Sequence, residues 1–294
     1  MAPLHEPSRT RVAPAPRRRV RLPTEGTYPY ATGGVSSWCD LLVSRLDEFD
    51  WDLPNVARGG RAPEMALGPG ELPAWRTMLV PAYLPPAGII DLLQDSARPR
   101  IVIINPHNGP GVEPRRSYGD AVRVAHEGGT RVLGYVATGH GMRPAADVLA
   151  DIDRHTWWYR VDGIFLDEVT QAEAELPYYA ALSRHIKAAC GRLVALNPGA
   201  VPARGYFDIA DIVVTFEGAY ADYAVALSRM PGWTRALPPD RIAHLVHGAS
   251  REQALAAVRH HGDAGYVYVT SGSPPNPWRT LPSYLHEQEQ VLRG

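Results

Sequence analysis

Short runs of apolar residues alternate with longer, more polar segments from residue 78 to the end of the chain. Eight runs have the length of a strand and are apolar almost throughout: 78–84, 100–105, 132–137, 163–167, 193–197, 212–216, 242–246 and 266–270. Continuous apolar runs are typical of strands that are buried on both faces of a parallel sheet. Segments with the length and pattern of helices follow most of them: 119–127, 145–154, 173–190, 219–230, 250–261 and 281–292.

This alternation predicts an α/β protein with the architecture of a (β/α)8 barrel. The first and fifth connections are expected to hold at best short helices. A doubly wound open sheet is the competing architecture, but it usually has fewer strands. Its phosphate-binding fingerprint, a run of glycines that follows an early strand and opens a helix, does not occur in this region of eight apolar runs.

Residues 1–74 have a different pattern, and we expect them to form an N-terminal extension to a barrel over residues 75–294. Residues 1–20 are rich in Pro, Arg and Ala without periodicity, which indicates a disordered arm. A strand is predicted over 20–30 and a helix over 35–49, and the Gly- and Pro-rich segment 58–74 resembles a linker.

The composition limits the classes of function. A hydrophobic fraction of 45% and a charged fraction of 21% exclude disorder of the whole chain, and the net charge of -1 argues against nucleic acid as a partner. No apolar run reaches the length of about 18 residues that a membrane helix needs. No apolar run follows the basic residues 17–19 either, so we expect a cytoplasmic protein, or a secreted one if the chain begins further upstream.

Neither a metal nor a cofactor is expected. Cys39 and Cys190 are far apart in the chain and are interpreted as two reduced thiols. The sequence contains no His-x-His pair and no His-Glu-x-x-His motif, which are common metal-binding patterns. The oligomeric state is left open.

Nearly every predicted strand ends in a group that can form hydrogen bonds. Because chemistry in a barrel takes place at the carboxyl ends of the strands, these groups are expected to meet at one mouth. Burying polar groups there costs free energy unless they form hydrogen bonds with each other or with a ligand. The candidates for substrate binding are Tyr83, Asn105, His107, Asn108, Tyr135, Thr138, His140, Asn197, His247 and Trp278.

Aromatic rings can stack on the flat apolar faces of sugars. Among the candidates, Tyr83, Tyr135 and Trp278 are the ones expected to stack. The consecutive aromatic residues Trp157, Trp158 and Tyr159 precede the fourth strand, at the opposite end of the barrel, and are expected to pack in the core.

Three carboxylates are the most specific chemical feature of the predicted strand ends. Asp167 and Glu168 end the fourth strand, and Glu217 ends the sixth. Glycoside hydrolysis needs two carboxyl groups, and Asp167 and Glu217 could face each other across a space that holds a sugar. Adjacent residues on a strand point to opposite faces, although the end of a strand can bend Glu168 toward the mouth as well. Asp167 and Glu168 could instead cap the following helix through Thr170 and its neighbours.

Several sequence words together resemble a known family. "VPAYLPP", "IVIINPHNGPG", "VLGYVATGHGMR", "DGIFLDE", "ALNPG" and "DIVVTFEG" occur in the order found in spherulin-4-like proteins. The resemblance implies a (β/α)8 barrel related to polysaccharide hydrolases, whose characterised fungal members are endo-acting galactosaminidases that cut α-1,4-linked galactosamine-containing glycan. It also implies that Asp167 is the nucleophile, that Glu217 is the general acid/base and that Glu168 is an assisting carboxylate.

A second resemblance covers residues 20–57, where "TEGTYPYATGGVSSWCDLLVSRL" is similar to the first strand, glycine turn and helix of family-4-type glycosyltransferases. One such unit is too small for a sugar-nucleotide pocket, so we interpret it as a fusion remnant or a packing extension.

The sequence therefore predicts a glycosidase that retains the anomeric configuration and cleaves a galactosamine-containing or related amino-sugar polysaccharide. Two alternatives stay open. One is a barrel that binds carbohydrate without cleaving it, and the other is an enzyme that acts on a small intracellular glycoside or a specialised metabolite.

Overall fold

The structure of the chain is a computed structural model, which describes residues 18–21, 49–52, 77–188 and 192–293. The chain divides into two units, Met1–Ala66 and Leu67–Gly294. In the first unit, strands β1 (Arg18–Arg21) and β2 (Phe49–Asp52) pair in parallel. The disordered arm predicted over 1–20 is wrong for residues 18–20, which belong to β1, and the helix predicted over 35–49 is wrong for Phe49, which opens β2. The rest of the arm and of this helix, the linker predicted over 58–74 and both cysteines lie outside the described residues, so these stay predictions.

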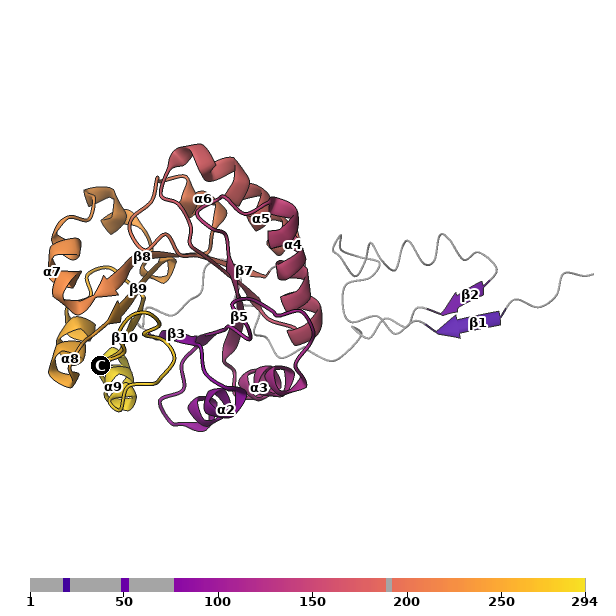
Figure 1. The fold of residues 1–294 in the computed structure, drawn as a ribbon, viewed down its shortest axis with the longest axis horizontal. Helices are drawn as coiled ribbons and strands as arrows, with labels where there is room; N and C mark the ends of the chain where they lie inside the picture. The colour runs from indigo at the N-terminus through magenta and orange to yellow at the C-terminus, as the bar shows by residue number, and fades with distance from the viewer. Residues whose placement is uncertain (1–17, 22–48, 53–76, 189–191, 294) are drawn as a thin grey trace, which may run out of the picture. The chain divides into compact units, whose positions relative to one another are not determined.

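The second unit is built on eight parallel strands whose order in the sheet follows their order in the chain. These strands are β3 (Leu79–Ala82), β4 (Ile101–Ile104), β5 (Arg131–Ala137), β6 (Gly163–Asp167), β7 (Leu193–Leu196), β8 (Ile212–Ala219), β9 (Ile242–His247) and β10 (Tyr266–Val269). Each lies inside or overlaps a predicted apolar run. The chain therefore forms the predicted (β/α)8 barrel (Figure 1).

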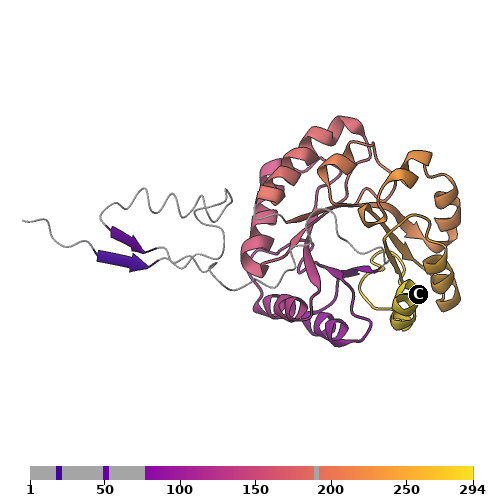
Figure 2. The ribbon, with the colours of Figure 1, turned by 180° about the vertical axis from the view of Figure 1, so that it is seen from behind.

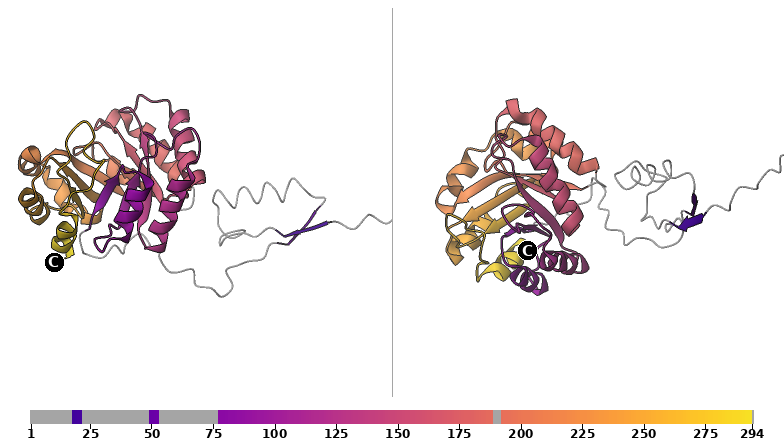
Figure 3. Two further views of the ribbon diagram at one scale, coloured as in Figure 1. Left: turned by 60° about the horizontal axis from the view of Figure 1, so that its bottom comes forward. Right: turned by 45° about the vertical axis from the view of Figure 1, so that its right-hand side comes forward.

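Helices surround the strands, as Figure 2 shows from behind and Figure 3 from two further directions. They are α2 (Pro86–Gln94), α3 (Arg116–Glu127), α4 (Ala145–Arg154), α5 (Leu176–Ala188), α6 (Tyr206–Ile209), α7 (Tyr220–Ser228), α8 (Arg251–Arg259) and α9 (Leu285–Arg293). The helix α9 follows α8 in the ring and contacts it through the ion pair between Arg251 and Glu287. No helix within the described parts of the chain is long and apolar enough to cross a membrane.

The barrel closes between its first and last strands through Thr77. The Thr77 amide donates a hydrogen bond to the Gly265 carbonyl at 3.0 Å, and the Val267 amide donates to the Thr77 carbonyl at 3.1 Å. These two bonds form a parallel bridge between Thr77 and Tyr266, next to the start of β3. The ring of strands is closed there by one bridge instead of a full ladder.

The strands are apolar because both of their faces are buried. All four residues of β4 are buried, and so are all four of β10. Gly163 opens β6 at a point where a side chain does not fit, since a Cβ there would lie 2.7 Å from Leu193 Cβ and 2.8 Å from Leu133 Cδ2. Close packing between neighbouring strands therefore requires glycine at this position.

Two features of the connections differ from the sequence prediction. The segment predicted as one helix over 173–190 starts as a 3-10 turn, Glu173–Glu175, and continues as α5. The chain after α4 continues as a π-helical turn, His155–Tyr159. Within this turn Tyr159 is buried and Trp158 is half-buried, but Trp157 is 77% exposed. The prediction that all three aromatic residues pack in the core is therefore wrong for Trp157, because the turn directs its ring to the surface.

Candidate active site

Asp167 and Glu217 lie close together at the carboxyl ends of their strands, and one side chain joins them. Asn197 follows β7, which lies between β6 and β8 in the sheet. Its Nδ2 atom donates a hydrogen bond to Asp167 Oδ1 at 2.7 Å and a second, short one to Glu217 Oε2. A single amide group therefore holds one oxygen of each carboxylate.

A β-bulge in β8 sets the direction of Glu217. Val214 pairs with Ala243 of β9 and Phe216 pairs with His244, so Thr215 is an extra residue in the ladder. Such a bulge reverses which side chains face the inside of the barrel. Phe216 packs its ring on Tyr223 of α7, outside the sheet, and Glu217 bonds to Asn197 at the mouth.

Burial raises the pKa of both carboxyl groups. For Asp167, loss of solvent is the largest cause, and it is opposed by hydrogen bonds from the Glu168 amide, the Tyr135 hydroxyl and Asn197. For Glu217, loss of solvent is again the largest cause, and the neighbouring charge of Asp167 raises the pKa further. Two acids that share a donor and repel each other in this way are unlike surface carboxylates, and such perturbed groups gather at functional sites.

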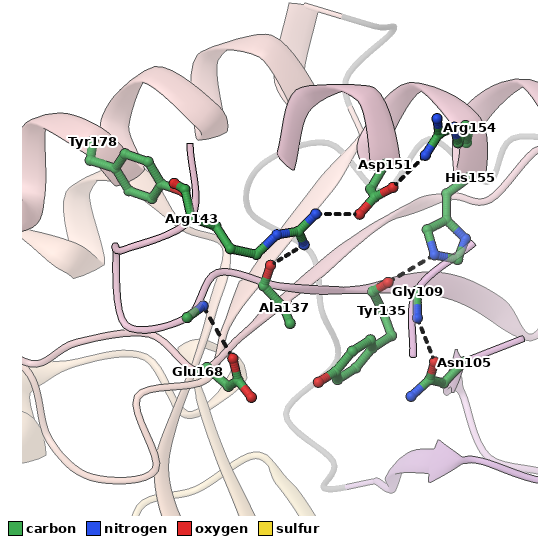
Figure 4. A network of polar contacts seen from close by, with 11 residues as sticks. Asn105, Gly109, Tyr135, Ala137, Arg143, Asp151, Arg154, His155, Glu168 and Tyr178 are labelled. Carbon is green, nitrogen blue, oxygen red and sulfur yellow. Dashed lines mark hydrogen bonds and ion pairs between the residues drawn. The ribbon is translucent and has the colours of Figure 1, made fainter. Parts of the chain in front are cut away.

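Glu168 leaves the strand in a left-handed conformation, with a φ of 53°. Its carboxylate accepts a hydrogen bond from the Gly139 amide at 3.1 Å, at the start of the loop between β5 and α4 (Figure 4). The Glu168 charge also raises the pKa of Asp167, although burial of Asp167 is the larger cause. The turn of the backbone therefore keeps both acids near the mouth, as the bend at a strand end allows.

The alternative in which these two acids cap the following helix is wrong. The 3-10 turn after β6 begins at Glu173, its N-cap is Ala172, and no side chain caps it. Both carboxylates are instead bonded to groups of other strands and loops.

Aromatic side chains lie beside the acids. Tyr83 and Tyr135 pack edge to face, with ring centroids 5.5 Å apart. The Trp278 indole Nε1 donates a hydrogen bond to Glu217 Oε1 at 3.2 Å, and its ring lies 6.2 Å from that of His247. The hydrogen bond from Trp278 to Glu217 was not expected from the sequence. Stacking on a sugar stays a prediction for Tyr83, Tyr135 and Trp278.

The remaining candidates lie in two loops at the same mouth. Asn105 follows β4 and its Oδ1 accepts a hydrogen bond from the Gly109 amide at 2.8 Å (Figure 4). His107, Asn108 and His140 are exposed. Their contact with a substrate stays a prediction.

Thr138 differs from the exposed candidates because its side chain is fully buried. Its hydroxyl lies 2.8 Å from the carbonyl oxygens of both Asp167 and Glu168 and 3.1 Å from the Tyr179 hydroxyl. Thr138 thus links the ends of β5 and β6, while contact with a substrate stays a prediction.

Two residues that support the site did not stand out in the sequence. Tyr179 of α5 bonds to Thr138, and the ring of His155 bonds to the carbonyl of Tyr135. Both sit in helical segments behind the strand ends, and nothing in their local sequence distinguishes them from ordinary packing residues. Among the residues that the structure describes, no group of three His, Cys, Asp or Glu side chains could hold a metal ion.

The barrel is similar to that of known carbohydrate-related proteins. It matches the crystal structure of Aspergillus clavatus Sph3 in complex with GalNAc with a TM-score of 0.64 and 24% sequence identity, over 75% of this chain and 98% of that one. It matches a chitinase from Chromobacterium violaceum with a TM-score of 0.54 and 11% identity, over 73% and 98% of the two chains. At these identities the likeness shows a shared fold.

Sequence comparison gives a closer relation. Spherulin-4 of Physarum polycephalum is 32% identical over 235 residues, which cover 74% of this chain and 70% of that protein. A family model described as a domain of unknown function, DUF3492, matches residues 18–66. The model of spherulation-specific family 4 matches residues 78–292, which run from just before β3 into the last turn of α9. The chain therefore belongs to the spherulin-4 family.

Proposed function

We propose that the protein is a retaining glycoside hydrolase that cleaves a galactosamine-containing or related amino-sugar polysaccharide. The observation that carries this proposal is the contact of one Asn197 amide with both Asp167 and Glu217. It holds two buried acids together at the mouth of a barrel whose solved relatives include Sph3 with bound GalNAc and a chitinase.

The spacing of the acids supports the retaining type. One oxygen of each carboxylate bonds to the same nitrogen, so these two oxygens lie no further apart than the sum of two hydrogen-bond lengths, about 6 Å. Retaining enzymes have carboxyl groups about 5–5.5 Å apart, whereas inverting enzymes need about 6.5–9.5 Å for an intervening water.

The hydrogen bonds around each acid support a division of roles. Asp167 accepts from three donors, the Glu168 amide, Tyr135 and Asn197, and each of them stabilises its ionised form. Glu217 accepts from two, Asn197 and Trp278, and the Asp167 charge opposes its ionisation. The first proton to leave the pair therefore comes from Asp167, which suits a nucleophile, while Glu217 keeps its proton and acts as the acid.

In the first step, an Asp167 oxygen attacks the anomeric carbon while Glu217 gives its proton to the glycosidic oxygen, so that the bond to the leaving sugar breaks. In the second step, the Glu217 carboxylate takes a proton from water, the water oxygen bonds to the anomeric carbon, and the ester to Asp167 breaks. Glu168 assists as a nearby charge, because its effect on Asp167 is electrostatic.

The test compares Asp167→Asn and Glu217→Gln with the full-length parent on galactosamine polymers and on an array of other glycans. Release of reducing ends measures cleavage, and NMR of the first product measures its anomeric configuration. Asp91→Asn, on the exposed face of α2, is the matched control. We expect a retained configuration and a loss of about 10³-fold or more in each site variant, with unchanged folding.

Each other result has a defined meaning. Unchanged cleavage by either site variant contradicts the assignment of the acids, and an inverted product contradicts the retaining mechanism. Glycan binding that survives both substitutions, without release of reducing ends by the parent, would identify a non-catalytic carbohydrate-binding barrel.

A further inference from the structure

The π-helical turn His155–Tyr159 places a buried histidine directly behind the site. His155 has no exposed surface, and its Nε2 lies 2.8 Å from the backbone carbonyl oxygen of Tyr135 (Figure 4). A carbonyl oxygen can only accept, so Nε2 carries the proton and donates. Tyr135 is also the residue whose hydroxyl lowers the pKa of Asp167 through a side-chain hydrogen bond.

The backbone makes room for this contact at one residue. Gly134 lies immediately before Tyr135 in β5, and a Cβ at Gly134 would lie 2.6 Å from His155 Nδ1 and 2.9 Å from its Cβ. The imidazole therefore lies across the strand at a place where any other residue would displace it. Glycine is unfavourable within a strand, so its presence is consistent with a close approach that the fold uses.

The surroundings of His155 Nδ1 indicate that the histidine is needed for its Nε2 donor and not for packing. Nδ1 is buried, and within the described residues it has no hydrogen-bond partner. An apolar side chain of similar size would fill the same space without leaving a buried acceptor unpaired, which is unfavourable. The contribution that only the histidine makes is the Nε2 donor. Burial lowers the pKa of His155 to about 4, so the ring is neutral near neutral pH and keeps this arrangement of protons.

The same turn also holds the neighbouring loop. The Tyr159 hydroxyl donates to the Pro110 carbonyl at 3.0 Å and accepts from the Arg115 amide at 3.3 Å. These residues belong to the loop between β4 and α3, which carries the exposed candidates His107 and Asn108. The π-helical turn is thus attached both to the strand of Tyr135 and to the loop beside it.

We propose that His155 is a positioning residue of the hydrolase site: by holding the Tyr135 carbonyl, it directs the Tyr135 hydroxyl onto the nucleophile Asp167. The residue does not contact the substrate, and it acts through Tyr135. This inference rests on the proposed function for its effect on turnover, but its effect on Asp167 is measurable without any substrate.

The central variant is His155→Leu in the full-length chain, with His155→Gln as the conservative variant, because the glutamine amide can still donate to the carbonyl. In the leucine variant the Tyr135 donor is displaced, so the ionised form of Asp167 is less stable and its pKa rises by about one unit. We expect kcat to fall about 10- to 100-fold with KM changed less than about 2-fold, since a small misplacement at the reacting centre affects turnover most. The glutamine variant should keep most of the parental kcat.

The pKa of Asp167 is measured by carboxyl ¹³C NMR, with the signal assigned from Asp167→Asn. His185→Leu is the matched control, because His185 pairs with Asp153 on the outer helices. A double-mutant cycle with Tyr135→Phe tests the route: once the phenol hydroxyl is absent, His155→Leu should cause no further shift. If His155→Leu does not fold, His155→Met provides the same comparison.

An unchanged Asp167 pKa in the folded leucine or methionine variant overturns the proposal, and so does a full additional shift on the Tyr135→Phe background. A loss of kcat in His155→Gln as large as in His155→Leu overturns it too, because packing and not the donor would then be responsible. If the parent cleaves no glycan, the proposed function fails, while the Asp167 titration still decides the role of His155.

Discussion

Replacing Asn197 with alanine removes the amide that the two acids share. The side chain gives one hydrogen bond to Asp167 and one to Glu217, so the substitution takes a donor from each acid. Both donors stabilise the ionised forms. The pKa values of both acids, which burial already raises, should therefore rise further.

The size of this effect follows from the strength of hydrogen bonds to charged groups, which contribute about 1.5–3 kcal/mol each. At about 1.4 kcal/mol per pKa unit, complete loss of one such bond corresponds to a shift of about 1–2 units. Water entering the space left by the amide will replace part of the interaction, so we expect about one unit. Loss of the fixed spacing should also lower the maximal rate, by about 10- to 100-fold.

The assay is the pH dependence of kcat/KM on a cleaved glycan. The acid limb reports the ionisation of Asp167 and the basic limb that of Glu217, so both limbs should move to higher pH in Asn197→Ala. Gln171→Ala is the matched control, because this amide lies on the same rim and donates to the Pro198 carbonyl at 3.2 Å. Limbs that stay in place, or that move to lower pH, would refute the argument that Asn197 stabilises both ionised acids.

Three further predictions concern other residues of the barrel. Trp278→Phe removes a donor from Glu217 alone, so the basic limb should rise by about one pH unit while the acid limb stays in place. Burial lowers the pKa of His155 to about 4 and that of His244 to about 3. Below pH 6.5 these two histidines are therefore protonated in the unfolded chain but still neutral in the folded chain. The free energy of unfolding should fall as pH drops below 6.5 toward 4, by up to about 1.4 kcal/mol per pH unit for each histidine. The raised pKa values of the two site acids offset part of this loss. Urea titrations that give the same free energy of unfolding at pH 7 and pH 5 would contradict this prediction. Gly163→Ala places a methyl group where no space exists between strands and should destabilise the barrel by about 1–3 kcal/mol, measured as a lower urea midpoint at constant slope.

Much of the fold was predictable because parallel strands buried on both faces leave a strong signal. The helix predicted over 145–154 has the bounds that α4 has in the structure. Irregular features were not predictable in this way. The extra residue Thr215 in β8 is held by a hydrogen bond with His244 of the next strand, at 3.0 Å, and the π-helical turn depends on contacts with β5 and the loop after β4. Such features come from tertiary contacts, which a single sequence does not display.

The candidate site was predictable as a set of strand ends, but the partners within it were not. Asn197 was identified as a candidate for substrate binding, and the structure shows it bonded to both acids. Trp278 bonds to Glu217 across 61 positions of sequence, and Glu168 reaches the mouth through a positive φ. A pattern of strands indicates which residues share an end of the barrel, whereas their pairing depends on register, bulges and backbone conformation.

The bridge at Thr77 has a practical consequence for any shortened form of the protein. The family match begins at residue 78, one position after the residue whose backbone joins the first strand to the last. A fragment that starts at residue 78 would lose both hydrogen bonds of the Thr77 bridge and expose the edges of β3 and β10. Exposed strand edges can pair with those of other molecules. An expression fragment of the barrel should therefore start several residues before Thr77, and one that starts at 78 should aggregate more readily.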